Sequence, residues 1–293
     1  MWTACIASNG LLYPPQQRLY NDPISEKFLS GGSKYFVKLR HVSPVQISVT
    51  AFCEILYSGM LGYLLCRFRY YDEVIEECLA TDEIDAIVNL GSGMDPKAYF
   101  LPGIEKIRYF EVDHPGGIKR KKETIKRVLG RLPDHVSYIA VGFHIRDIRT
   151  ELQKAGCDLS STTLFVWESV SAYLTGKAND AILSFVPKAG SASKIIFSYV
   201  SEDLITGENL DNRGLSRLSR SMEKHGLLVL GFDPDTIEDY LAKFGLVTLD
   251  HRRPQEFKQR YVIQQALGRD VIEVERFVLA QVNECTAADL VAS

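Results

Sequence analysis

From residue 85 to residue 200 the sequence alternates between short apolar runs and helix-like segments, and this alternation limits the folds open to the chain. The apolar runs are Ala86–Leu90, Ile107–Val112, Val136–Val141, Thr163–Trp167 and Lys194–Val200. Strands that are apolar on both faces are typical of a parallel sheet with helices on both sides. The sequence therefore predicts a doubly wound, Rossmann-like α/β sheet.

Helical patterns precede this alternating region and follow it. The N-terminal part has helical spacing, including "DPISEKFL", with proline at a helix start, and the apolar span Ile55–Cys66, which we expect to be a buried core helix. After the fifth run, the polar segment Glu202–His225 is predicted to form an inserted helical lid. The stretches "LVTLDHRR" and "ERFVLAQV" are predicted to complete the sheet as an antiparallel pair.

These patterns predict one compact unit with two parts. The first is an N-terminal helical cap over residues 1–81. The second is the sheet-containing core over residues 82–293, with the lid insert at about 201–230. A chain of 293 residues is long enough for one large α/β domain with such an elaboration.

Composition and charge exclude several classes of protein. The formal net charge of −3 gives no general attraction to nucleic acid or anionic lipid, and the basic run Lys119–Arg127 is typical of a solvated helix face. The longest apolar span is shorter than the ~20 residues that a membrane helix needs. The 6 cysteines are scattered, so we expect neither a zinc site nor disulfides, core thiols at Cys53 and Cys66, and a reducing, cytoplasmic location.

A glycine turn follows the first apolar run, in "VNLGSGMDPKAYFL". In an open α/β sheet, ligands bind at the carboxyl ends of the strands, where this turn is expected. Gly91 and Gly93 fit the first two positions of the dinucleotide fingerprint, but Pro96 stands at the third, which disfavours a nicotinamide or flavin cofactor. No G-K-[ST] follows, so the turn is not a P-loop.

Acidic residues end the second predicted strand, in "YFEVDHP". Asp113 lies 20 residues after Gly93, where a carboxylate accepts hydrogen bonds from ribose hydroxyls. Glu111 points to the same side of the strand and competes for this role. The glycine turn and the acid together predict a cofactor that contains adenosine.

Four stretches, "IVNLGSGMD", "YFEVDHP", "IRDI" and "FVWESVSAYLT", occur in an order and spacing that resemble the leucine carboxyl methyltransferase family. The resemblance spans roughly Asp22–Val200. That family includes protein phosphatase carboxyl methyltransferases and bacterial polyketide carboxyl O-methyltransferases. The resemblance implies a class I methyltransferase sheet and S-adenosylmethionine as cofactor.

The resemblance also assigns cofactor contacts. It implies that Gly91 and Gly93 let the backbone approach the cofactor, that Asp95 belongs to the same site, and that Asp113 binds the ribose hydroxyls. The alternative for Asp113 is to cap the helix that begins near Pro115.

Arg67, in "RFRYYD", matches the family's arginine that pairs with the cofactor carboxylate, a contact that suits a guanidinium. The alternative is a surface arginine at a helix end. Lys34 or Lys38 could supply a second cation. His144 stands where the family has an aspartate that contacts adenine, so that contact stays with His144 or passes to the backbone and Ile145.

The remaining candidates surround the methyl group in this reading. Glu168 would stabilise the sulfonium or orient the methionine amino group, unless it forms a structural salt bridge. Tyr173 and Tyr199 could line the acceptor pocket, although buried tyrosines are more often core residues. Arg213 could hold an anionic acceptor.

A carboxylate acceptor is ionised at neutral pH and needs no general base, whereas a hydroxyl usually needs one, such as His225 or His251. We therefore expect an S-adenosylmethionine-dependent O-methyltransferase that esterifies a small-molecule carboxylate. The alternatives are a protein C-terminal carboxyl methyltransferase, methylation of a hydroxyl, and a non-catalytic cofactor-binding regulator. No metal, nucleic acid or membrane partner is expected.

Overall fold

The structure, a computed structural model, describes residues 19–20, 22–29, 57–142, 145–208, 210, 213–226, 228–262 and 270–283. Within these ranges the centre of the molecule is a seven-stranded sheet of order β3-β2-β1-β4-β5-β7-β6. Its strands are β1 (Ala86–Leu90), β2 (Arg108–Asp113), β3 (Val136–Ala140), β4 (Thr163–Trp167), β5 (Lys194–Tyr199), β6 (Leu246–Arg252) and β7 (Arg276–Val282).

The sheet confirms the predicted fold class. Strands β1 to β5 are parallel, and β7 is inserted antiparallel between β5 and β6. The strand order reverses between β1 and β4, so the carboxyl ends of these two strands form the crevice where such sheets bind ligands.

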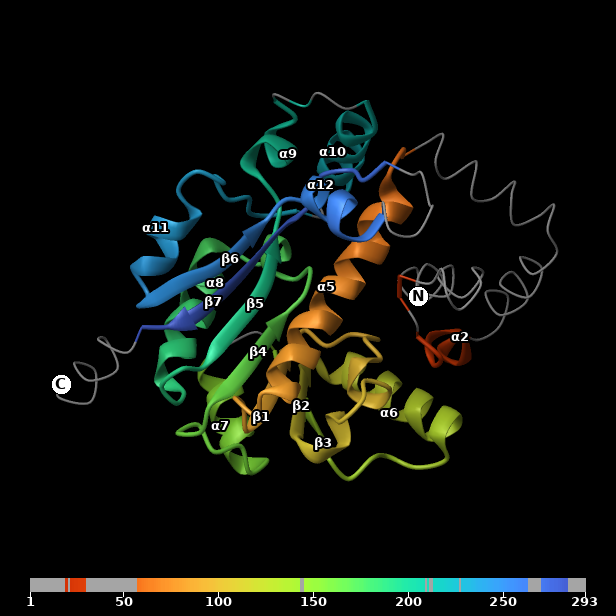
Figure 1. Cartoon of the computed structure of the whole chain (residues 1–293), viewed down its shortest axis with the longest axis vertical. Helices are drawn as coiled ribbons and strands as arrows, with labels where there is room; N and C mark the ends of the chain where they lie inside the picture. Colours follow the sequence, from red (N-terminus) through yellow and green to blue (C-terminus); the bar gives the residue numbers. More distant parts are fainter. Residues whose placement is uncertain are drawn as a thin grey trace.

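Helices cover both faces of the sheet (Figure 1). The α-helices are α2 (Ser25–Phe28), α5 (Met60–Ala80), α6 (Pro115–Leu129), α7 (Ile145–Lys154), α8 (Gly176–Phe185), α9 (Glu202–Thr206), α10 (Arg213–His225), α11 (Ile237–Ala242) and α12 (Pro254–Phe257). Short 3-10 turns lie at Lys97–Tyr99 (η2), Ile104–Lys106 (η3), Ser171–Tyr173 (η4) and Val186–Lys188 (η5), and a π-helical turn, η6, spans Lys258–Val262. The predicted lid segment therefore contains α9 and α10.

Two hydrophobic clusters lie on opposite faces of the sheet. Ile87 and Val166 pack in the cluster under α5, whereas Val88 and Phe165 pack in the cluster with α7, α8 and α11. Because side chains alternate along a strand, a polar residue near the carboxyl end faces the same side as the residue two positions before it. Asn89, Glu111, Asp113 and Glu168 are thereby directed to the α5 side.

Helix α5 differs from its expected start. The apolar span Ile55–Cys66 was expected to be helical throughout, but Tyr57–Gly59 form a turn and the helix begins at Met60. Gly59 has a φ of 84°, and a Cβ there would lie 2.7 Å from the backbone nitrogen of Ile272. A residue with positive φ does not continue a right-handed helix, so the prediction for this span was wrong at its beginning.

The described residues also bear on three further expectations from the sequence. Cys66, Cys78 and Cys157 are buried and unpaired, which confirms Cys66 as a core thiol; Cys53 lies outside the described residues. No described helix is long and apolar enough to cross a membrane. The division of the chain at residue 81 stays a prediction, although α5 packs directly on the sheet.

Candidate functional site

A cavity of about 160 Å³ opens at the carboxyl ends of β1 and β4, on the α5 side of the sheet. It is lined by Tyr20, Ser25, Arg67, Phe68, Asn89, Gly91, Ser92, Gly93, Met94, Asp95, Pro96, Lys97, Glu168 and Ser169. This volume is below the roughly 300–1,000 Å³ of typical small-molecule sites, so the enclosed space suits one end of a larger ligand.

The glycine turn forms the floor of this cavity. Gly91 and Gly93 have φ values of 76° and 45°, a region that favours glycine. The N–H of Gly91 donates to the carbonyl of Val112 at 2.8 Å, which joins the turn to β2. Among the described residues, a Cβ on Gly93 would meet only the carbonyl oxygen of Gly91, at 3.8 Å, so this part of the turn leaves space for a ligand.

Asp113, the last residue of β2, lies beside this turn. Its Oδ2 accepts a hydrogen bond from the N–H of Gly93 at 2.7 Å, and its Oδ1 accepts one from the N–H of His114 at 2.6 Å. Because a carboxylate has about four acceptor sites, two remain for hydroxyl groups. The residue that caps α6 is His114, so the alternative role of Asp113 as the helix cap was wrong.

Glu111 faces the same side but is engaged elsewhere. Its carboxylate forms an ion pair of 2.7 Å with Lys121 of α6, and both side chains are fully buried. Lys121 also donates to the carbonyl of Ser92 at 3.2 Å. Burial raises the pKa of Glu111 to about 7, against the opposing effect of Lys121. We therefore retain Asp113, rather than Glu111, as the proposed ribose ligand.

The Glu111–Lys121 pair also corrects the expectation for the basic run Lys119–Arg127. Lys119, Arg120, Lys126 and Arg127 are exposed, as expected of a solvated face, but Lys121 lies on the inner side of α6. One lysine of the run therefore supports the glycine turn.

Arg67 enters the cavity from α5. It is only 6% exposed, so the alternative prediction of a surface arginine was wrong. Its Nε forms an ion pair of 3.0 Å with Glu168 Oε1. Its Nη1 donates to Ser169 Oγ at 2.8 Å and lies 3.4 Å from Glu275 Oε2. No hydrogen bond joins Nη2 to another described residue, and because Arg67 lines the cavity, its guanidinium can hold a carboxylate there.

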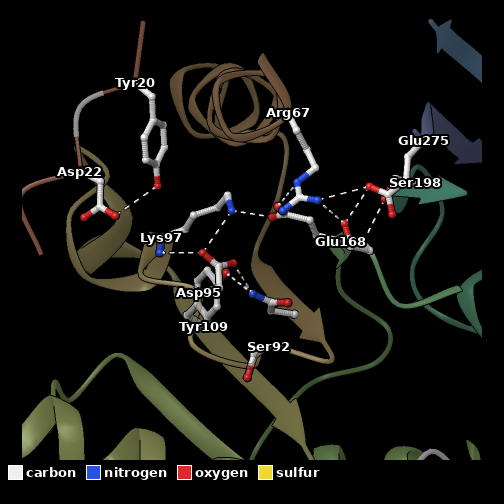
Figure 2. Close-up of polar contacts among 12 residues, drawn as sticks. Tyr20, Asp22, Arg67, Ser92, Asp95, Lys97, Tyr109, Glu168, Ser198 and Glu275 are labelled. Atoms are coloured by element: carbon white, nitrogen blue, oxygen red, sulfur yellow. Dashed lines mark hydrogen bonds and ion pairs between the residues drawn. The ribbon is translucent and has the colours of Figure 1, made fainter. Parts of the chain in front are cut away.

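Glu168 lies between two buried cations (Figure 2). While Oε1 pairs with Arg67, Oε2 accepts a hydrogen bond from Lys97 Nζ at 2.7 Å. Lys97 Nζ also lies 3.1 Å from Asp95 Oδ1, and Asp95 Oδ2 accepts from Asn89 Nδ2 at 2.8 Å. A continuous polar chain therefore runs from the glycine turn to α5.

The charges around this chain shift several ionisation equilibria. Burial opposes the charge on Arg67 and Lys97, but their carboxylate neighbours raise the pKa of both above the ordinary values. Burial acts against the Asp95 carboxylate, yet Lys97 and Lys121 hold its pKa below the ordinary value. Burial raises the pKa of Asp72 well above its usual range, and Lys97 opposes that shift.

Several members of this cluster were missed by sequence reasoning, among them Lys97, Ser169 and Glu275. Ser169 has a φ of 55°, unusual for a residue with a side chain, and such strain is often found at functional sites. Its hydroxyl donates to Glu275 Oε2 at 2.8 Å, and Tyr63 donates to the same oxygen. Glu275 precedes β7 and has no local motif, whereas Lys97 comes directly after the glycine turn, at the start of η2.

The other predicted acceptor residues do not line this cavity. Tyr173 is 52% exposed. Partial burial of its hydroxyl raises its pKa, and the negative charge of Glu275 adds to this effect. Arg213 is exposed at the start of α10. Tyr199 is fully buried on the opposite face of the sheet, and its hydroxyl lies 2.8 Å from His251 Nε2. We therefore remove Tyr199 from the proposed acceptor site.

His144, Lys34 and Lys38 lie outside the described residues. Ile145 begins α7, and its side chain is outside them too. Among the described residues, no group of three or more histidine, cysteine or acidic side chains has an arrangement that could hold a metal ion.

The comparisons with known proteins agree with this geometry. A family model described as leucine carboxyl methyltransferase matches residues 3–187. YktD of Bacillus subtilis, named as a candidate S-adenosyl-L-methionine-dependent methyltransferase, is 25% identical over 266 residues, covering 90% of this chain and 79% of that protein. A protein of the same description from Mycobacteroides abscessus is 28% identical, covering 83% of this chain and 81% of the relative.

Two solved structures share the fold. A DUF574 family protein from Streptomyces avermitilis has a TM-score of 0.58 at 12% identity, covering 96% of this chain and 97% of that chain. A protein from Thermobifida fusca, described as a candidate methyltransferase, has a TM-score of 0.53 at 13% identity, covering 82% and 88%. At these identities the likeness shows the fold alone.

Proposed function

The chain belongs to the leucine carboxyl methyltransferase family and is an S-adenosylmethionine-dependent methyltransferase, and from this premise we propose that it converts a carboxylate of a small molecule to a methyl ester. The observation that carries the proposal is the cavity at the β1 and β4 carboxyl ends, with its glycine turn on one side and Arg67 on the other.

The described residues suit the parts of this cofactor. The open space at Gly93 and the remaining acceptor sites of Asp113 suit the ribose, and Arg67 Nη2 suits the methionine carboxylate. The enclosed part of the cavity suits the methionine end. S-adenosylmethionine supplies an electrophilic methyl group on a sulfonium centre, and the protein contributes alignment and exclusion of water.

The nature of the cavity wall favours a carboxylate acceptor. No histidine among the described residues lines the cavity, and its acids are engaged: Glu168 by Arg67 and Lys97, Asp95 by Lys97 and Asn89. An acid held by cations is a poor general base. A carboxylate acceptor needs no base because it is already ionised at neutral pH. Tyr173 and Arg213, which are both exposed, stay proposed acceptor contacts.

The buried, unpaired thiols of Cys66, Cys78 and Cys157 support a reducing compartment, and we propose the cytoplasm. The proposed partner is the small-molecule substrate.

The test uses S-adenosylmethionine with a labelled methyl group. The protein is incubated with a small-molecule extract and, separately, with the protein fraction of the source cells. Label in the small-molecule fraction that mild alkali releases as methanol is the expected result, because esters hydrolyse and ethers do not. Alkali-stable label would favour hydroxyl methylation, and alkali-labile label on protein would favour the protein C-terminal reading. Wild-type protein that binds the cofactor but labels neither fraction would favour a regulator.

A further inference from the structure

The Arg67 and Glu168 side chains, which resemblance assigns to the cofactor, depend on a third residue that it does not assign. Lys97 follows the glycine turn and Pro96, in η2. Lys97 is only 2% exposed, yet it lines the cavity. Its ammonium group lies 5.6 Å from the centre of the Tyr71 ring, so the charge is held in place by an aromatic face and by two acids.

The geometry gives Lys97 a specific position between the two sides of the cavity. On one side it bonds Asp95, next to the turn that carries Gly93, and on the other it bonds Glu168, past the end of β4 (Figure 2). These two acids belong to loops after different strands. One ammonium group therefore connects them across the cavity.

The contact between Lys97 and Glu168 also affects which groups Arg67 can bind. Glu168 has two oxygens, and Lys97 occupies Oε2 while Arg67 Nε occupies Oε1. If Lys97 were absent, Arg67 would be the only described cation paired with Glu168 and also with Glu275. A guanidinium drawn toward two uncompensated carboxylates is less able to hold a third.

We propose that Lys97 is a positioning residue for the cofactor: it fixes Glu168 and Asp95 across the cavity and so leaves Arg67 Nη2 directed at the methionine carboxylate. This inference rests on the proposed function, because it takes this cavity as the S-adenosylmethionine site. Lys97 also reduces the negative potential near the sulfonium position by neutralising Glu168.

The proposal separates two ligands that differ only at sulfur. S-adenosylmethionine is cationic there, and S-adenosylhomocysteine is neutral. Loss of Lys97 weakens the binding of the carboxylate group of both ligands. It also leaves the negative charge of Glu168 without compensation from Lys97, and that charge attracts only the sulfonium. The affinity for S-adenosylhomocysteine should therefore fall further than the affinity for S-adenosylmethionine.

The experiment is calorimetric titration of both ligands into wild type, Lys97→Met, Lys97→Arg and Lys121→Met. Lys121→Met is the matched control, since it removes an equally buried lysine from beside the same turn but outside the cavity lining. For Lys97→Met we expect the dissociation constant of S-adenosylhomocysteine to rise about 10- to 100-fold, with a smaller rise for S-adenosylmethionine. Lys97→Arg should restore most of the affinity, and Lys121→Met should change the ratio of the two constants less than Lys97→Met does.

Equal dissociation constants in Lys97→Met and wild type, or an unchanged ratio between the two ligands, would overturn the proposal. If Lys97→Met does not fold, the double variant Lys97→Met with Glu168→Gln is compared with Glu168→Gln alone. Because Lys97 is proposed to act on Arg67 through Glu168, these two variants should bind both ligands alike, and a double variant that binds markedly more weakly than Glu168→Gln would contradict the proposal. Wild type that binds neither ligand would remove the proposed function first, and this inference with it.

Discussion

Two buried lysine–glutamate pairs flank the glycine turn, and their surroundings differ. Lys97 and Glu168 lie 2.7 Å apart in the cavity wall, and Glu168 is shared with Arg67. Lys121 and Glu111 also lie 2.7 Å apart, but behind the turn, and both are fully buried. The same pair of residue types therefore faces a ligand cavity in one place and the protein interior in the other.

The difference shows why an ion pair alone is a weak sign of function. Besides each other, Lys121 and Glu111 contact the Ser92 carbonyl and Tyr99, and burial raises the pKa of Glu111 to about 7. The Lys97–Glu168 pair belongs to a chain of charges that connects the turn, β4 and α5. The two pairs therefore differ in position: only the Lys97–Glu168 pair connects several secondary-structure elements that surround the cavity.

The largest effect is expected from breaking the cavity-side network at Arg67. Replacing Arg67 with Met leaves Glu168 and Glu275 with less compensation in a buried site. Removing one partner from a buried ion pair costs about 3–5 kcal/mol, so the free energy of unfolding in urea should fall by that amount. Arg69→Met, two residues along α5 with a half-exposed partner in Glu76, is the control and should lose less than about 1 kcal/mol. Equal losses in the two variants would contradict the network.

A smaller, pH-dependent effect is expected from the pair behind the turn. The pKa of Glu111 is raised by burial from 4.5 in the unfolded chain to about 7 in the fold. Its contribution to stability is therefore full below pH 4.5 and is lost as the pH rises toward 7. From pH 4.5 to pH 7.5 the unfolding free energy of wild type should therefore fall by about 1–3 kcal/mol relative to that of Glu111→Gln, in addition to a cost, independent of Glu111 titration, that the variant carries for leaving Lys121 unpaired. Parallel pH profiles of unfolding free energy would show that Glu111 has an ordinary pKa.

The smallest effect is expected on the opposite face of the sheet. Tyr199→Phe removes one hydroxyl that lies 2.8 Å from His251 Nε2 and leaves the ring packed among Phe197 and Phe232. The unfolding free energy should fall by about 0.5–1.5 kcal/mol, and the affinity for S-adenosylmethionine should not change. A changed affinity in a well-folded Tyr199→Phe variant would return Tyr199 to the ligand site.

Much of the fold could be predicted because it depends on local patterns. The five apolar runs match strands β1 to β5 within a residue at their ends, and the last two strands pair antiparallel as expected. Alternation along β2 placed Glu111 and Asp113 on one side of the sheet. The same alternation, applied from Phe197, places Tyr199 on the other face, and the spacing of Lys121 from Ile118 and Ile125 marks it as inward-facing.

The site was less accessible to sequence reasoning. Glu275 lies 208 residues from Arg67, so only the folded sheet brings them together. The choice of Asp113 over Glu111 as the proposed ribose ligand depended on which of the two acids pairs with a buried lysine in the fold. No sequence pattern around either acid specifies its partner. Arg67 and Glu168 were identified by resemblance, because a buried arginine on an apolar helix has no periodic signal of its own.

The central claim is that the cavity at the β1 and β4 carboxyl ends binds S-adenosylmethionine with Asp113 on the ribose. Calorimetric titration of S-adenosylmethionine into wild type and Asp113→Ala tests it directly. We predict micromolar binding by wild type and an affinity about 10- to 100-fold lower in the variant, since two charged hydrogen bonds are lost. Equal binding by the two proteins would contradict the assignment of Asp113, and no binding by wild type would contradict the site.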